Sequence, residues 1–568
     1  MPIHGGDDTS IGVEIRPREG AAGRRAAAAN PGALACIAGL ILLASSARVA
    51  AEVKPTRQAG PRLVAADGRT RLEVNGRPFL ILGGELANSS AASPAAVKAA
   101  LHDLPQLGLN TVLVPVYWEL VEPQEGKLDF GLVGAAIAEA RRSRLHVVLL
   151  WFGSWKNGMS SYVPAWIKRD QKRFPRAETA DGHGVESLSA FSEANRDADA
   201  RTFAALLRYV RTVDGRAQTV VMVQVENEVA SIGQAADHSA AAQAALHGPV
   251  PPELLRALPA GTPLPAGTPR AAGRPTWEEL FGKGPATEER FAAWHYARYV
   301  DAVARAGRAE YPLPLFVNAA LNGPGLAPGK YPSAGPLPHL FEIWKAGAPT
   351  IDLLAPDIYF PDFAAWCQRF RRGDNPLFVP EARNGEEAAV NALYAVGQQA
   401  IGVSPFAIDE IAPAAGAPLG RAYRLLAELA PLLLAAGPGR TAGVLVDKDA
   451  PGTELSMGGF KLTVRHDYTF PWSSPARNDA VWPRGGGLVI ALGDDEYLVA
   501  GNGIIVTFEP ATPGDPVAGL ERVDEGRIEH GHFVVTRRLN GDETHQGRQV
   551  RLPMGTFDLQ RVKLYRYR

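Results

Sequence analysis

The sequence predicts an α/β fold, a (β/α)8 TIM barrel, followed by an all-β, sandwich-like domain. Between residues 79 and 434, short apolar runs alternate with segments whose apolar residues recur at helical spacing. Such alternation is typical of a parallel sheet, and eight repeats favour closure into a barrel. Beyond residue 436 the long helical segments stop, and short alternating strands separated by turns follow. The chain has 568 residues, 46% of them hydrophobic, which is enough material for two domains.

The barrel is expected to span residues 52–435 and the β domain residues 436–568. Polar residues 52–75 lead through a turn at Asn75 and Gly76 into the first strand. We expect barrel strands at residues 79–82, 111–116, 146–151, 220–225, 315–318, 353–359, 377–380 and 402–408. Helices are expected at residues 93–107, 129–142, 192–211, 287–307 and 419–434. Two long insertions, 231–283 and 321–350, would overhang the mouth of the barrel, where loops shape binding sites.

Residues 1–51 resemble a secretory leader. Arg24 and Arg25 precede an uncharged run over residues 26–47, and small residues follow it. This pattern predicts a periplasmic or secreted protein, with an uncleaved membrane anchor or a wrongly assigned start as the alternatives. Of the two cysteines, Cys36 lies in this segment and Cys367 in the barrel, so we expect neither a disulfide framework nor a thiolate metal cluster.

The net charge and the absence of several binding motifs limit the classes of ligand that the sequence predicts. The formal net charge is −1 and there is no long basic run, which argues against nucleic acid and against an anionic membrane surface. There is no GxSxG elbow and no GxGxxG that opens a helix, and the run Gly485 to Gly487 is interpreted as a turn. His530 and His532 have no third ligand nearby. We therefore expect a neutral substrate, no cofactor and no metal, and the sequence leaves a homo-oligomer open.

Two apolar runs end in acids, and both are predicted barrel strands. VVMVQVENEV ends in Glu226, Asn227 and Glu228, and PLFVPEARNG places Glu381 just after a strand. The carboxyl ends of parallel barrel strands meet at the mouth, where catalytic groups collect. A pair of carboxylates there can hydrolyse a glycoside, since one protonates the leaving oxygen and the other attacks or supports the anomeric carbon. Asn227 suits a sugar hydroxyl.

These motifs resemble a known enzyme family. VVMVQVENEV, together with VPVYWELVEPQEGKLDF, resembles glycoside hydrolase family 35, the β-galactosidases, over roughly residues 62–435. The segments GGELANSS, WFGSWKNG and PLFVPEARNG resemble a bacterial subgroup with an accessory C-terminal β domain. The resemblance implies a retaining exo-β-galactosidase acting on plant oligosaccharides such as xyloglucan side chains, with Glu228 as acid/base and Glu381 as nucleophile.

Two positions depart from the pattern of the family. Asn88 stands where better-known family members have a tyrosine, and Ser154 where they have a glutamate, and both positions normally contact galactose. A β-glucosidase, a β-xylosidase or a non-catalytic carbohydrate-binding protein therefore stay open. If the enzyme is retaining, its two carboxyl groups should lie about 5–5.5 Å apart.

The remaining site predictions are residues at strand ends. The resemblance implies that Tyr359 hydrogen-bonds the nucleophile, with a core aromatic as the alternative. Glu226 is expected to be a structural acid paired with an arginine. Trp118 and Trp155 could each stack on a sugar face or be buried in packing. The full set of predicted substrate-binding residues is Asn227, Glu85, Asn88, Trp118, Trp155, Lys156, Asn157 and Tyr359.

Overall fold

A computed structural model describes residues 60–258, 274–471, 475–512 and 516–568, all within one compact unit that spans residues 57–568. The leader predicted at residues 1–51 lies outside the described residues. No helix in the described ranges has the length and apolar character needed to cross a membrane.

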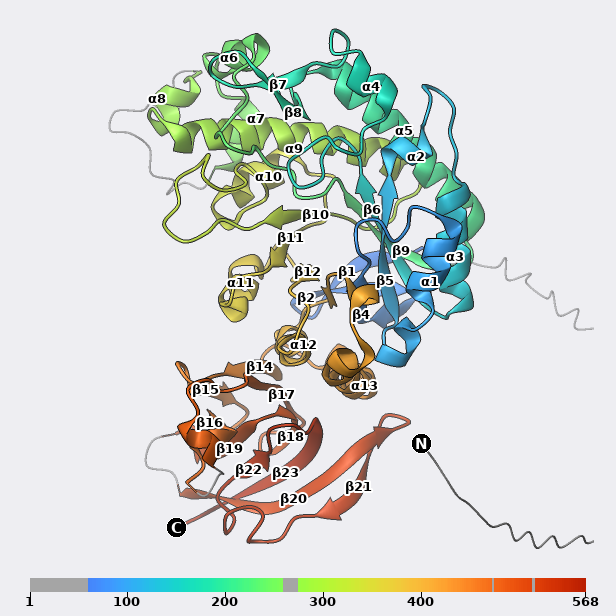
Figure 1. Ribbon diagram of the computed structural model, residues 1–568. Helices are drawn as coiled ribbons and strands as arrows, with labels where there is room; N and C mark the ends of the chain where they lie inside the picture. Colours follow the sequence, from blue (N-terminus) through green and yellow to red (C-terminus); the bar gives the residue numbers. More distant parts are fainter. Residues whose placement is uncertain (1–59, 259–273, 472–474, 513–515) are drawn as a thin grey trace, which may run out of the picture. The chain divides into compact units, whose positions relative to one another are not determined.

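The predicted barrel is confirmed (Figure 1). Eight parallel strands pair with their neighbours in chain order, and the last pairs with the first to close the barrel. They are β4 (Ile81–Glu85), β5 (Thr111–Tyr117), β6 (His146–Phe152), β9 (Val220–Val225), β10 (Leu315–Ala320), β11 (Leu353–Ile358), β12 (Val379–Ala382) and β13 (Gly402–Pro405). Nearly every residue of these strands is buried, as expected when helices cover the outside of a barrel and side chains fill its interior.

The first predicted strand, residues 79–82, is divided between the end of one strand and the beginning of the next. β1 (Arg62–Ala66), β2 (Arg69–Val74) and β3 (Arg77–Phe79) form a small antiparallel sheet, and β4 begins only at Ile81. Asn75 and Gly76 both have positive φ, 53° and 72°, and they join β2 to β3. The predicted turn is therefore confirmed, because two left-handed residues match the twist of a tight hairpin.

Helices follow most of the barrel strands. α1 (Pro94–Leu101) is shorter than the predicted helix 93–107, which is completed by a separate 3-10 turn, η1 (Leu104–Leu107). Pro105 explains the break, because it has no N–H for the helix ladder. The other helices around the barrel are α2 (Trp118–Val121), α3 (Gly131–Arg142), α4 (Ala165–Arg169), α5 (Glu193–Asp214), α9 (Pro285–Glu310), α10 (Phe341–Gly347), α11 (Phe363–Phe370), α12 (Ala388–Gly397) and α13 (Pro413–Ala435).

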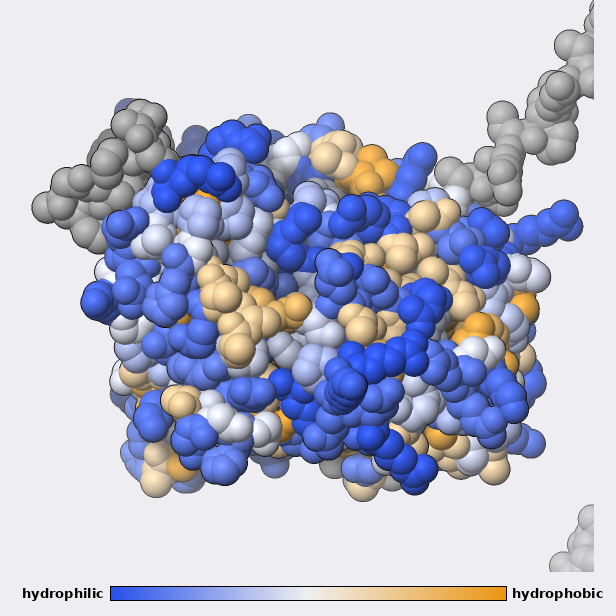
Figure 2. Space-filling view, turned by 90° about the horizontal axis from the view of Figure 1, so that it is seen from above, coloured by the Kyte–Doolittle hydropathy of each residue, from blue (hydrophilic) through white to orange (hydrophobic). Residues whose placement is uncertain are grey.

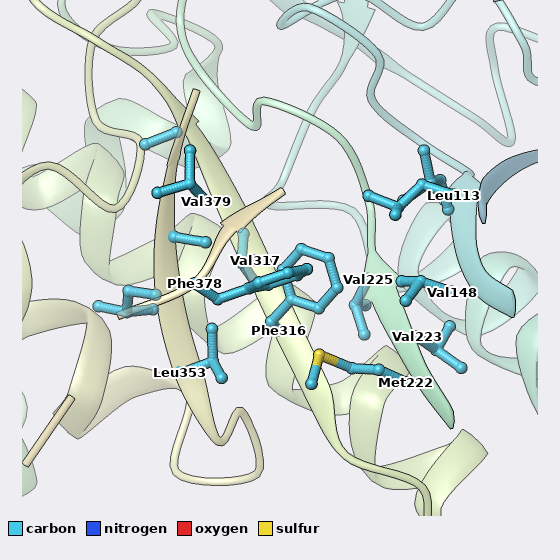
Figure 3. Close-up of a cluster of buried hydrophobic side chains, with 14 of the residues drawn as sticks. Leu113, Val148, Met222, Val223, Val225, Phe316, Val317, Leu353, Phe378 and Val379 are labelled. Atoms are coloured by element: carbon cyan, nitrogen blue, oxygen red, sulfur yellow. The ribbon is translucent and has the colours of Figure 1, made fainter. Parts of the chain in front are cut away.

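The barrel interior is apolar away from the mouth. Met222 of β9, Phe316 of β10 and Phe378, just before β12, belong to one buried cluster, in which the two phenylalanine rings meet edge to face at 5.2 Å (Figure 3). The insertions after β9 and β10 carry α6 (Ala240–Leu246), α7 (Pro252–Ala257), α8 (Trp277–Phe281) and η2 (Pro338–Leu340), and the hairpin of β7 (Arg176–Glu178) and β8 (Gly184–Leu188) follows β6. In contrast to this apolar interior, the carboxyl ends of the barrel strands carry polar side chains.

The C-terminal domain has two antiparallel sheets, which confirms the predicted all-β fold. One sheet has the order β14-β17-β18-β23-β20-β21 and the other β15-β16-β19-β22. Both contribute to one apolar core, so the domain is a sandwich. The strands are β14 (Thr441–Val446), β15 (Gly452–Met457), β16 (Phe460–His466), β17 (Gly485–Ala491), β18 (Glu496–Asn502), β19 (Ile504–Pro510), β20 (Val517–Glu529), β21 (His532–Arg538), β22 (Val550–Leu552) and β23 (Asp558–Tyr567).

The turn predicted at Gly485 to Gly487 is wrong, because these residues begin β17 and pair with β14 and β18. A Cβ on Gly487 would lie 2.3 Å from the Ala500 carbonyl oxygen, so the glycines permit close packing of strands. Figure 2 shows one face of the molecule, on which hydrophobic residues form small separated patches among hydrophilic ones.

Candidate active site

The end of β9 is fixed by its neighbours on both sides. Glu226 and Glu228 have positive φ, 61° and 47°, so the chain turns sharply as it leaves the strand. The Asn227 N–H donates to the Trp155 carbonyl at 3.1 Å, and the Glu228 N–H donates to Asn318 Oδ1 at 2.9 Å. Glu226, Asn227 and Glu228 are all buried. The acids predicted from VVMVQVENEV therefore occupy one defined geometry at the mouth of the barrel.

Glu381 comes from the opposite part of the barrel, on β12, and pairs in register with Asp357 of β11. The Tyr359 hydroxyl donates to Glu381 Oε1 at 2.5 Å. Arg383 donates to the Tyr359 carbonyl oxygen at 2.8 Å, which holds the segment that carries this tyrosine. The contact that the family resemblance implies between Tyr359 and Glu381 is thus present.

Three carboxyl groups meet at this point. One oxygen from each of Glu228, Asp357 and Glu381 lies within 4.8 Å of the other two. Asn318 Nδ2 donates to Asp357 Oδ2 at 2.6 Å, while its Oδ1 accepts from the Glu228 backbone, so this amide connects two of the acids. Our sequence reasoning missed both Asp357 and Asn318. The available signal was polarity inside an apolar strand: Asp357 shares a strand face with Tyr359, two residues later in LLAPDIYF.

Burial sets the proton affinity of these groups. Glu228 is 7% exposed, and burial, followed by the nearby Glu381 carboxylate, raises its pKa to about 7, while Lys156 opposes the shift. Burial also raises the pKa of Glu85 and of Asp357 well above their usual range, again with Glu381 as the second cause. A carboxyl with a pKa near neutrality can hold a proton before reaction and release it during reaction.

Several polar atoms around this cluster have no hydrogen-bond partner among the described residues. Both amide atoms of Asn227 are buried and unpartnered, and so are Glu85 Oε1, Asp357 Oδ1 and Glu381 Oε2. Lys156 is 6% exposed, and its ammonium lies 5.0 Å from the centre of the Phe152 ring. Buried polar atoms normally find partners, so these atoms indicate a place where a polar ligand could bind.

The predicted stacking of sugars on Trp118 and Trp155 does not fit the structure, because both indoles are fully buried. Trp118 Nε1 donates to Glu122 Oε2 at 3.1 Å, and its ring packs near Trp151. Trp155 Nε1 donates to Ser187 Oγ at 2.9 Å. A ring with no exposed face has nothing to offer a sugar, and a sequence does not distinguish an indole at a site from one beneath it.

Asn88 and Asn157 are less closely tied to the cluster. The Asn88 carbonyl accepts from the Tyr117 hydroxyl at 2.7 Å, and its Oδ1 is buried without a partner. Asn157 is exposed, with φ of 55°, in the turn between Lys156 and Met159. Their contact with a sugar stays a prediction.

The predicted arginine partner of Glu226 is wrong, because the ion pairs among the described residues do not include this side chain. Glu226 Oε2 instead accepts the Trp155 N–H at 2.8 Å, and the Glu226 carboxyl faces Asp199 of α5. Asp199 in turn accepts the Ser154 hydroxyl at 2.6 Å. Our sequence reasoning also missed Asp199, which lies within an amphipathic helix and looks there like an ordinary surface acid.

The oxygens of the three-carboxyl cluster are close enough to surround a cation, yet their spacing equally suits a catalytic pair of acids. The absence of a metal and of a cofactor stays a prediction.

Comparisons with known proteins match parts of the chain. A model of a domain of unknown function, DUF5597, matches residues 419–551, which include most of α13 and most of the β domain. A β-galactosidase from Xanthomonas manihotis is 32% identical over 182 residues, covering 30% of this chain. The chain covers 27% of that protein's length.

Among solved structures, a β-galactosidase from Rahnella sp. R3 has a TM-score of 0.45 and 16% identity, with 63% of this chain and 57% of that chain covered. A catalytic mutant of a GH42 β-galactosidase from G. stearothermophilus has a TM-score of 0.46 and 15% identity, with 64% of this chain and 58% of that chain covered.

Proposed function

We propose that this protein is a retaining exo-β-galactosidase that removes terminal β-galactosyl residues from oligosaccharides. The observation that carries the proposal is the meeting of Glu228 and Glu381, from β9 and β12, with carboxylate oxygens within 4.8 Å of each other. Retaining glycosidases keep their two carboxyl groups about 5–5.5 Å apart, whereas inverting enzymes leave about 6.5–9.5 Å for a water molecule. The partial similarity to a β-galactosidase agrees with this assignment.

The reaction would proceed in two displacements. Glu381 attacks the anomeric carbon as the bond to the leaving oxygen breaks, and Glu228 gives that oxygen its proton. A glycosyl ester on Glu381 results. Glu228, now ionised, takes a proton from water, whose oxygen attacks the same carbon and releases the sugar with its original configuration. The Tyr359 hydroxyl, donating to Glu381 Oε1, orients the nucleophile for the first step.

The galactose preference, the assignment to family 35 and a xyloglucan-type substrate form the finer part of the proposal, and they rest on sequence motifs. Ser154 is turned toward Asp199 and Tyr299, so it does not replace the sugar contact that a glutamate makes in the family. Glu85, Asn227 and Lys156 supply polar atoms near the acids instead. The leader-like residues 1–51 further support a periplasmic or secreted location.

The first experiment compares turnover of a 4-nitrophenyl β-galactoside by wild type and by the variants Glu228→Gln and Glu381→Gln. A third variant, Glu253→Gln, removes an exposed acid on α7 and serves as the control. We expect the control to match wild type and each site variant to lose at least about 10³-fold in kcat/KM. Equal rates in all four proteins would reject catalysis by this pair and leave a carbohydrate-binding protein as the second candidate.

A panel of 4-nitrophenyl glycosides tests the sugar. We expect the β-galactoside to have the highest kcat/KM of the panel. A preference for the β-glucoside or β-xyloside would keep the mechanism and replace the substrate. Hydrolysis of galactosylated xyloglucan oligosaccharides, followed by detection of free galactose, then tests the natural class of substrate.

A further inference from the structure

A second pair of acids lies beneath the candidate active site. Asp199 of α5 and Glu226 at the end of β9 are both completely buried, and their carboxyl groups are hydrogen-bonded to each other. Neither belongs to the cluster of Glu228, Asp357 and Glu381. Two ionised carboxylates cannot share a buried site at such short range, because their repulsion is not screened there.

The donors around the pair determine which acid is ionised. Asp199 Oδ1 accepts the Trp151 indole N–H at 2.8 Å. Its Oδ2 accepts the Ser154 N–H at 3.1 Å and the Ser154 hydroxyl at 2.6 Å. Because Ser154 gives its proton to Asp199, the Tyr299 hydroxyl must be the donor in its 2.6 Å contact with Ser154. Three donors converge on Asp199, which is what an ionised carboxylate requires.

Glu226 is placed differently. Its Oε2 accepts the Trp155 N–H at 2.8 Å, and the Ser154 N–H also faces this carboxyl, whereas Oε1 is buried without a hydrogen-bond partner among the described residues. A proton on Oε1 turns this atom into the donor of the bond to Asp199 and satisfies both groups. Burial raises the pKa of both acids. At Asp199 the hydrogen bonds from Glu226, Ser154 and Trp151 oppose this shift, whereas at Glu226 the neighbouring Asp199 adds to it, which agrees with a neutral Glu226.

The pair is connected to the catalytic acid through the backbone. The Trp155 N–H donates to the Glu226 carboxyl, and the Trp155 carbonyl oxygen accepts the Asn227 N–H at 3.1 Å. Residues 154 and 155, which follow β6, are therefore joined to both Glu226 and Asn227, and Glu228 comes next. We propose that Glu226 and Asp199 share one proton, carried by Glu226, and that this pair positions Asn227 and Glu228 for catalysis.

This inference rests on the proposed role of Glu228 as the catalytic acid. Its test is therefore chosen so that failure of the positioning role can be told apart from failure of the proposed function. If Glu228 is displaced, proton donation fails while the rest of the site still works. Glycosides of phenol, a poor leaving group, need that proton, whereas 2,4-dinitrophenyl glycosides leave without it. A general loss of structure would slow both substrates alike. The ratio of the two kcat/KM values therefore reports on positioning of the acid.

Glu226→Gln keeps a donor to Asp199 and an acceptor for the Trp155 N–H, so both kcat/KM values should stay within about threefold of wild type. Asp199→Asn must turn an NH2 group toward a donor, either the Trp151 indole or the Ser154 amide, and should lose activity. Glu226→Ala should lose about 10²-fold with the phenyl glycoside and much less with the dinitrophenyl glycoside. Equal losses with both substrates would overturn the positioning role.

Asp214→Asn is the matched control. Asp214 is buried like Asp199, and it accepts the Val220 N–H at 2.7 Å at the opposite end of the same strand, β9. This variant should be less stable, with an unchanged ratio between the two substrates. If its ratio shifts as much as that of Glu226→Ala, the effect belongs to the strand in general and the assignment to this pair fails.

Thermal unfolding tests whether the two acids share a proton, and it needs no activity assay. The titratable groups that face the pair are Tyr299 of α9 and, beyond it, Arg196 of α5. A carboxyl whose pKa is raised by folding stabilises the protein at acid pH and loses that contribution as pH rises through the raised value. The Tm of wild type should therefore fall relative to that of Glu226→Gln between about pH 5 and pH 9. A constant difference would contradict a proton on Glu226, even if the wild type hydrolyses no glycoside.

Discussion

At the scale of single residues, the chemistry depends on how Glu228 is surrounded. It is nearly buried, its backbone N–H is held by Asn318, and the carboxylates of Asp357 and Glu381 lie close by. Removal from water, followed by the negative charge of Glu381, raises the pKa of Glu228 and favours its protonated form, whereas Lys156 and the hydrogen bond to Asp357 oppose this shift. In the proposed mechanism, this side chain therefore holds the proton that the leaving glycosidic oxygen needs.

This environment predicts the alkaline side of the pH profile. Above its pKa of about 7, Glu228 is ionised and has no proton to donate. For a phenyl glycoside, kcat/KM should be halved near that pH and then fall about tenfold per unit. The 2,4-dinitrophenyl glycoside should lack this decline. Kinetics from about pH 5 to pH 9 provide the check, and an identical decline for both substrates would remove Glu228 from the role of acid.

Sequence reasoning found Glu228 and Glu381 because each ends an apolar strand abruptly in a motif with a family resemblance. It missed Asp357, Asn318 and Asp199, which lie inside otherwise apolar or amphipathic segments. Their partners come from other strands and helices, so only the fold brings them together. The two alternatives for Trp118 and Trp155 stayed open for the same reason, since one residue type serves both in a sugar site and in a buried core.

At the scale of elements, β9 is held at both ends by buried acids. Where the strand begins, the Asp214 carboxylate accepts hydrogen bonds from the N–H groups of Thr219 and Val220. Where it ends, Glu226 accepts a hydrogen bond from the Trp155 N–H. Gly153 lets the chain after β6 pass close to this second contact. A Cβ there would lie 2.3 Å from Trp151 Nε1 and 2.8 Å from Glu226 Oε1.

Gly153→Ala should therefore destabilise the protein and reduce activity together. The neighbours of the new methyl group are themselves buried and hydrogen-bonded, so we expect a cost of about 1–3 kcal/mol. Gly373→Ala is the control, because Gly373 is exposed and has nothing within 4 Å of an added Cβ. Its effect should stay within about 0.5 kcal/mol. Equal melting temperatures for the two variants would show that the close approach at residue 153 is not required.

At the scale of the whole molecule, the barrel and the β sandwich share a core. Leu488, Leu498 and Ala500 of the six-stranded sheet belong to the same hydrophobic cluster as the barrel residues. Gln398, just after α12, donates to the Gly443 carbonyl on β14 at 3.1 Å. Sequence reasoning predicted both folds from their different periodicities. It did not predict this junction, because glycines that permit close backbone contact leave no hydrophobic pattern.

The junction leads to a stability prediction. A Cβ on Gly443 would lie 2.2 Å from the Tyr394 carbonyl oxygen of α12, a backbone atom that cannot move aside. Gly443→Ala should lower the melting temperature clearly, at a cost of about 1–3 kcal/mol or more. Gly541→Ala, in an open turn of the β domain, should change it little. Scanning calorimetry compares them, and an unchanged Tm for Gly443→Ala would show that the two parts do not depend on this contact.

The central claim is that Glu381 becomes covalently attached to the sugar. The most direct measurement uses the 2-deoxy-2-fluoro glycosyl fluoride of the sugar that the glycoside panel selects. Fluorine at C2 slows both displacements, while the good leaving group allows the first, so the intermediate accumulates. Mass spectrometry should show one added fluorosugar, on the peptide that contains Glu381, and none in Glu381→Gln. Turnover without an adduct, or an adduct on Asp357, would contradict the account.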